Sequence, residues 1–366
     1  MKTLKNIGKI ALLSLALCGG TTSCNYLDVV PPEQASLPDA TKDPESTLGF
    51  LFSCYGGIRN PFDYQTVEAG ADEYVLPPLW NTGSQKITWD LNLPTNIADG
   101  WSWGSNYRFI GQCLLFLQQL PHARGVTDEQ KRAWAAEANF LLAYYHMVTL
   151  VAYGPCPITD TYIDQATPES EYNGRMHFDY VKDWICQKFD EVCEDGQLPA
   201  TRTGDEWGRA TSVMAKALKA RLLVYAASPL FNGSFPYKDW ENTNFETPGY
   251  GKELISLKYD RKKWEVAKAA CQEAITAAEA AGHKLFSLED AQSLYQQAGL
   301  PLPFVPFKSA EGGTADKDKE FMERVQLMRY VVTTRYKEGN RETIWGLANQ
   351  GTMIIGSLPH LSLIHI

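Results

Sequence analysis

Apolar residues recur at three- and four-residue spacing through most of this 366-residue chain, and this helical period limits the fold more than any other feature. In residues 128–153, Trp134, Leu141 and Tyr145 follow this spacing, and Asp128 is expected to cap the start of the helix. The sequence therefore predicts a mostly α-helical protein. The same period covers residues 44–59, 103–120, 177–194, 208–227 and 261–281.

Alanine is frequent in the last two of these patterns, residues 208–227 and 261–281. Small residues at helical spacing let neighbouring helices approach closely, as in proteins built from repeated helix hairpins. The helices pair plausibly, but no 34-residue period matches the tetratricopeptide consensus, because inserts of variable length separate them. We therefore expect a solenoid-like helical body that is interrupted by long irregular loops.

Three long inserts separate the helical patterns. Two of them, residues 60–102 and 231–258, hold several aromatic residues, which in the first insert stand beside Asp, Asn and Glu. The third, residues 286–318, has the composition of a loop. Long loops on a rigid body usually carry function. An aromatic ring can meet the C–H face of a sugar, while amides and carboxylates bind its hydroxyl groups. The first insert supplies three candidate aromatic platforms and two candidate hydroxyl partners, namely Trp80, Trp89, Trp101, Asp72 and Asn81.

Other tryptophans have a structural role in this interpretation. Trp103, Trp134, Trp184 and Trp264 fall on helical patterns and are expected to be buried. Trp240, in the second insert, is a weaker ligand candidate, because a loop aromatic commonly fastens its loop to the body.

The N-terminus has the composition of a signal peptide. A lysine-containing start precedes a short apolar run at residues 10–17, and small and hydroxylated residues follow as far as Ser23. Cys24 then stands where bacterial lipoprotein processing attaches lipid, and two or three acyl chains hold a protein firmly to a membrane. We expect residues 1–23 to be a leader, residues 24–42 a proline-containing tether and residues 43–366 the folded domain. The alternative is ordinary secretion with Cys24 free or in a disulfide.

Charge and motifs narrow the classes of function. The formal net charge is −9 and no block is rich in Lys or Arg, so nucleic acid is not expected as a partner. The sequence holds no GxSxG, HExxH, GxxxxGK[ST] or strand-linked GxGxxG motif, so neither catalysis nor a cofactor is predicted. Asp72 and Glu73 could serve as a glycosidase carboxylate, but such enzymes need two opposed carboxylates.

No metal site is predicted either. Asp316, Asp318 and Glu320 alternate as at the start of a calcium loop, but the glycine of the sixth position is absent, so the run is interpreted as a solvated loop. The six cysteines after Cys24 show no CxxC pair and are interpreted as free, mostly buried thiols. A metal or a bridge at the pair Cys186 and Cys193 is the alternative.

Five stretches, in order along the chain, together resemble the SusD/RagB family of bacterial outer-membrane lipoproteins. They are SCNYLD at 23–28, AEANFLLAYYHMVTLVAYGPCPI at 136–158, WGRATSVMAKALKARLLVYAASPLFNG at 207–233, KYDRKKWEVAKAACQEAI at 258–275 and NRETIW at 340–345. The chain departs from the family pattern at Leu142, where Arg is usual. Family members also continue well beyond the fifth stretch, so the C-terminus is expected to be truncated.

This resemblance implies a fold and a function. The fold would be four tetratricopeptide-like helix pairs that support irregular loops. The protein would bind an oligosaccharide at the outer membrane, facing the cell exterior, as a lid on a SusC-like TonB-dependent transporter, without catalysing a reaction. The helical repeats would face the transporter and the aromatic loops the ligand. Peptide capture, as in RagB-like members, a glycoside hydrolase and a scaffold that only contacts its transporter remain alternatives.

Overall fold

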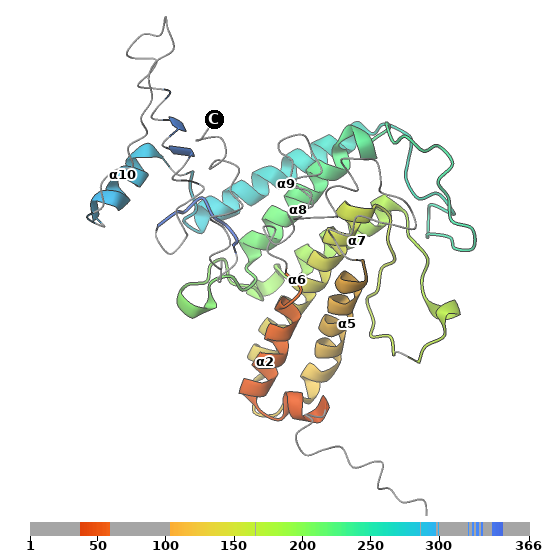
Figure 1. Cartoon of the computed structure of the whole chain (residues 1–366), viewed down its shortest axis with the longest axis horizontal. Helices are drawn as coiled ribbons and strands as arrows, with labels where there is room; N and C mark the ends of the chain where they lie inside the picture. Colours follow the sequence, from red (N-terminus) through yellow and green to blue (C-terminus); the bar gives the residue numbers. More distant parts are fainter. Residues whose placement is uncertain are drawn as a thin grey trace, which may run out of the picture.

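A computed structural model describes residues 37–58, 103–164, 166–285, 287–297, 299 and 339–346, together with single positions between 321 and 331. Helices dominate this part of the chain (Figure 1), which contains only two isolated β-bridges. The mostly helical fold expected from the sequence is confirmed. The α-helices are α2 (Pro44–Tyr55), α5 (Trp103–Gln119), α6 (Asp128–Tyr153), α7 (Phe178–Glu191), α8 (Ser212–Ala227), α9 (Arg261–Ala280) and α10 (Leu288–Gln297).

From α5 to α9, each helix packs against the next helix in the chain. The loop between α6 and α7 and the loop between α8 and α9 project from the same side of these helices, at the right in Figure 1. The start of α5 meets the end of α6, where the Trp103 N–H donates to the Tyr153 hydroxyl over 3.1 Å. The end of α8 likewise meets the start of α9, because Asn232 bonds the backbone of Asp260. Consecutive helices thus form antiparallel hairpins, the arrangement of a tetratricopeptide-like superhelix.

Local chemistry fixes where α6 begins and ends. Its cap is Thr127 rather than Asp128, because the Thr127 hydroxyl accepts the Gln130 N–H while the Gln130 side chain accepts the Thr127 N–H. Asp128 is the first helical residue, so the sequence prediction was wrong by one position. Gly154 ends the helix with a φ of 69°, a conformation that favours glycine.

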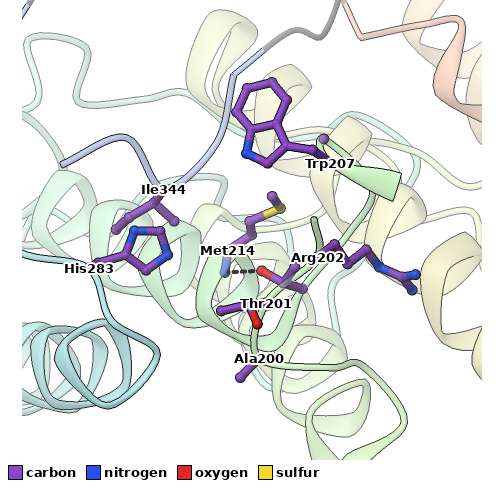
Figure 2. A pocket seen from close by; sticks show the side chains of 9 residues that line it. Ala200, Thr201, Arg202, Trp207, Met214, His283 and Ile344 are labelled. Carbon is purple, nitrogen blue, oxygen red and sulfur yellow. Dashed lines mark hydrogen bonds between the residues drawn. The ribbon is translucent and has the colours of Figure 1, made fainter. Parts of the chain in front are cut away.

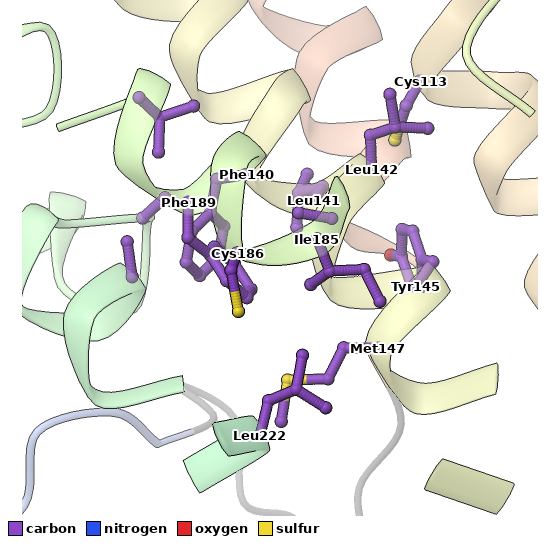
Figure 3. Packing of buried hydrophobic residues seen from close by; sticks show 14 of the residues in the cluster. Cys113, Phe140, Leu141, Leu142, Tyr145, Met147, Ile185, Cys186, Phe189 and Leu222 are labelled. Carbon is purple, nitrogen blue, oxygen red and sulfur yellow. The ribbon is translucent and has the colours of Figure 1, made fainter. Parts of the chain in front are cut away.

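The core lies where α6, α7 and α8 meet. Phe140, Leu141 and Tyr145 of α6 pack with Ile185 of α7 and Leu222 of α8, and each is almost fully buried (Figure 3). Burial of large apolar side chains is the main stabilising contribution to such a fold. The two alanine-rich segments behave as expected, since α8 and α9 pack closely through a buried alanine row on α9: Ala267, Ala270, Ala274 and Ala278.

Tryptophan burial only partly follows the sequence prediction. Trp134 is buried, whereas Trp103 and Trp184 are half-buried at the edge of the core. Trp264 is 42% exposed, so its predicted burial was wrong. Trp264 and the alanines of α9 both fall at helical spacing in the sequence. The packing of α9 against α8 buries the alanines and leaves Trp264 exposed.

The six cysteines of the described residues are free thiols. Four are buried and two are half-buried, as the sequence predicted, and Cys186 and Cys193 form no bridge. Burial raises the pKa of the Cys186 thiol to about 12. Within the described ranges, no helix is both long enough and apolar enough to cross a membrane.

A buried ion pair joins the second and third motif stretches. The Glu137 carboxylate on α6 is inaccessible to solvent and accepts hydrogen bonds from Arg202 at 3.0 Å and from Arg209 at 2.6 and 3.1 Å. Tyr55 of α2 donates to the same carboxylate over 2.6 Å, and its oxygen accepts the Ala210 N–H. This network ties α2, α6 and the loop before α8 together.

Trp345 of the fifth stretch docks onto the same region. Its indole N–H donates to the Gly208 carbonyl over 3.0 Å, and its ring makes edge contacts with Phe140 and Tyr144. Three motif stretches that are far apart in the sequence therefore meet around the end of the loop that precedes α8. Their residues are explained by packing and charge pairing within the fold.

Candidate ligand-binding loops

The end of α6 and the start of α5 anchor the loop of residues 154–177. The Arg175 guanidinium lies 4.8 Å from the centre of the Trp103 ring and donates to the carbonyls of Tyr153 and Pro155. The Tyr107 hydroxyl donates to the Pro157 carbonyl over 2.7 Å. These bonds give the loop a fixed path from α6 to α7.

The loop of residues 232–258 is fastened against the first one. The Asn242 side chain donates to the Arg175 carbonyl over 2.6 Å, and the hydroxyl of Thr247 accepts the His177 N–H. Further along, the Phe178 N–H at the start of α7 donates to the Leu254 carbonyl over 2.8 Å. The second loop is thus held by hydrogen bonds at several points to the segment where α7 begins.

Residues 235–240 of this second loop form an aromatic cup. The rings of Phe235 and Trp240 are stacked, with centres 5.5 Å apart and planes at 9°. Tyr237 meets the edge of Phe235 with ring centres 5.8 Å apart and is 70% exposed. These six residues line an open cavity of about 580 Å³. A hollow of this size, which presents ring faces to solvent, is within the range of small-molecule sites.

The chemistry of the cup suits a polyhydroxylated ligand. Lys238 and Asp239 lie in the cup beside the rings and supply an ammonium donor and a carboxylate acceptor. Aromatic faces can cover the C–H surface of a sugar while such polar groups bind its hydroxyls. The Trp240 ring also approaches Gly154, so it fastens the loop and lines the cup at the same time.

A second hollow, shown in Figure 2, is too small for an organic ligand. Trp207, Met214, His283 and Ile344 are among the side chains around it, and its volume is about 10 Å³. That volume holds about one water molecule. It therefore marks the junction of the segment 339–346 with α8 and the loop before it, rather than a binding site.

The sequence analysis placed its site residues in the first insert and at the lipid attachment point. All of them lie outside the residues that the structure describes: Cys24, Asp72, Trp80, Asn81, Trp89 and Trp101. The possible carboxylate Glu73 and the alternating acids from Asp316 to Glu320 also lie outside them. Sequence reasoning did not select Tyr237, although three aromatic residues within FPYKDW at 235–240 were a usable signal.

No family model and no curated protein sequence matches the chain. Among solved structures, BT4246 is 52% identical, with a TM-score of 0.75 over 84% of this chain and 51% of that protein. A selenomethionine form of BT4246 is 51% identical, with a TM-score of 0.71 over 83% and 50% of the two chains. A SusD-like protein from Bacteroides fragilis NCTC 9343 shares the fold, with a TM-score of 0.52 over 76% of this chain and 48% of that one, at 17% identity.

This chain has the fold of SusD-like proteins. The SusD-like helical fold implied by the five sequence stretches is thereby confirmed. The chain spans about half the length of BT4246.

Proposed function

We propose that this SusD-like chain is a surface glycan-binding protein that captures an oligosaccharide. The observation that carries the proposal is the aromatic cup, in which Tyr237 stands 70% exposed beside the stacked rings of Phe235 and Trp240. Exposed aromatic rings cost free energy in water, so a fixed, open group of them is commonly a binding surface. The SusD-like fold supports the same role.

In this proposed role, the chain acts as a lid for a SusC-like TonB-dependent transporter in the outer membrane. Lipid on Cys24 would hold it at the membrane, facing the cell exterior, and residues 25–36 would let it move on the transporter, since Leu37–Thr41 already form a short helix packed on α2. It binds its ligand without a reaction. Co-purification of the chain with an outer-membrane barrel, and loss of incorporated palmitate in Cys24→Ala, are the expected results. A transporter complex that forms without this chain would contradict the lid role.

Calorimetric titration of the full chain against neutral oligosaccharides and against peptides tests the binding proposal. We expect oligosaccharides to bind and Tyr237→Ala to weaken binding about tenfold, which equals about 1.4 kcal/mol. Tyr172→Ala is the matched control, because Tyr172 is also exposed, at 47%, but lies outside the cup. Binding of peptides alone would favour a RagB-like role, and hydrolysis of a bound glycan would contradict the binding-only proposal.

A further inference from the structure

A second cavity, of about 300 Å³, lies among the first turns of α7 and α9, the last turns of α8 and residue Tyr250 of the second loop. It shares no lining residue with the aromatic cup. Leu223 of α8 and Val266 of α9 form part of its apolar wall, and charged side chains of α7 and α9 form the rest. We call it the Tyr250 cavity.

The Tyr250 ring is held in place from one side. It stacks on His177 with ring centres 3.9 Å apart and planes at 14°, and His177 is fully buried. The Tyr250 N–H also donates to the Thr247 carbonyl over 3.0 Å. Because His177 occupies one face of the ring, Tyr250 can offer a ligand its other face and its hydroxyl. Burial raises the pKa of that hydroxyl, so it stays protonated at neutral pH.

A largely buried carboxylate, Asp179, lines the same cavity and is paired with lysines. The Lys263 ammonium lies 2.8 Å from both oxygens of Asp179, but it makes a hydrogen bond only with Oδ2. The Oδ1 atom has no hydrogen-bond partner, although Asp179 is only 7% exposed. Lys182 lies 3.7 Å from that atom and pairs with Asp183 at 2.7 Å. Because Oδ1 is itself closed to solvent, Asp179 holds Lys263 and Lys182 at the cavity wall rather than offering that oxygen to a ligand.

The charges around the cavity balance. Lys182, Lys262 and Lys263 are matched by an equal number of aspartates on its lining, so the cavity has no net charge that would select an anion or a cation. A neutral ligand with many hydroxyl groups fits better, because each hydroxyl both donates and accepts and can lie between an ammonium and a carboxylate. The volume, at the lower end for small-molecule sites, suits a short ligand.

We propose that the Tyr250 cavity is a second saccharide subsite, which binds a neutral sugar ring against Tyr250 with its hydroxyls on Asp183 and Lys182. This inference rests on the proposed glycan-binding function and adds a site separate from the cup. A ligand with one sugar in each site would be held at two points of the same loop, so its dissociation would require both contacts to break.

Hydrogen–deuterium exchange on the full chain, with and without neutral oligosaccharides, tests the subsite. We expect slower exchange in residues 178–183 and 247–263 as well as in residues 235–240. Slower exchange in residues 235–240 alone overturns the subsite and leaves the proposed function standing. No change in either region with any neutral glycan overturns both. Binding restricted to uronic-acid or sulfated sugars overturns the assignment of a neutral ligand.

A pair of variants on α7 gives the second readout. Asp183 is 65% exposed and lines the cavity, whereas Asp190 on the same helix is 52% exposed and pairs with Lys219 outside it. We expect Asp183→Asn to weaken oligosaccharide binding about tenfold and to remove the protection of residues 247–263, while Asp190→Asn changes neither. Equal binding by both variants, with unchanged protection, overturns the subsite.

Discussion

Replacing Glu137 with glutamine should destabilise the protein strongly, although it changes a single oxygen to an amide. The Glu137 carboxylate is fully buried and compensates Arg202 and Arg209, whose side chains are only 8% and 13% exposed. Without it, Glu206, which is 56% exposed, is the one acid among the described residues that still pairs with the two largely buried guanidinium groups. Removing one partner of a buried ion pair commonly costs about 3–5 kcal/mol, since the remaining charge stays desolvated.

The measurement is urea unfolding of the full chain, followed by circular dichroism. With an m-value near 3 kcal/mol/M, a loss of about 3 kcal/mol lowers the unfolding midpoint by about 1 M. Glu206→Gln is the matched control, because it removes the exposed acid of the same network and should cost at most about 1 kcal/mol. If Glu137→Gln unfolds at the midpoint of Glu206→Gln, the buried charge does not hold these segments together and the reasoning is refuted.

Two further predictions concern the core. Burial lowers the pKa of His146 from 6.5 to about 4, and the neutral ring accepts the Thr159 N–H. Below pH 6.5 the unfolded chain therefore binds more protons than the folded chain. The stability of the fold should fall as the pH drops toward 4. Between pH 7.5 and 4.5 this contribution is about 2–3 kcal/mol, so urea midpoints of His146→Leu should depend correspondingly less on pH; an unchanged pH dependence would show that His146 titrates normally. Gly57→Ala should cost about 1–3 kcal/mol, since a Cβ there would lie 2.4 Å from the Phe109 ring. Gly49→Ala, at an exposed position of α2 with no atom within 4 Å, should instead stabilise by up to about 1 kcal/mol, and equal melting temperatures of the two variants would contradict the packing argument.

Most helices could be predicted from this sequence because their signals are local, but α10 was missed, since it lies in the insert 286–318 that was interpreted as a loop. The apolar period located α5 and α6 nearly in full, and alanine content indicated the close packing of α8 and α9. Local reasoning fails where two neighbouring residues could both cap a helix. At the start of α6, the hydroxyl of Thr127 competes with the carboxylate of Asp128, and only the backbone geometry selects the cap. It fails again at Trp264, because the side of α9 that faces α8 is set by tertiary packing.

Contacts between distant residues had no signal in the sequence. Glu137 and Arg209 lie in two of the motif stretches, yet nothing in either stretch shows that they pair across the core. The same is true of the Tyr250 cavity, whose lining residues come from three helices and a loop. The aromatic cup is different, because all of its lining residues are consecutive. A search for clusters of aromatic residues within six positions would have found it.

The bonds that hold the second loop carry a consequence for how such a protein can change its ligand. The aromatic cup is bracketed by main-chain bonds, from the Ser234 N–H to the Pro229 carbonyl and from the Leu254 N–H to the Trp240 carbonyl. Main-chain bonds of this kind are available to almost any residue. Apart from Phe235 and Trp240, whose rings pack against the body, the position of the cup is therefore nearly independent of the side chains inside it. Evolution can exchange those side chains to suit a new nutrient while the scaffold that presents them stays the same.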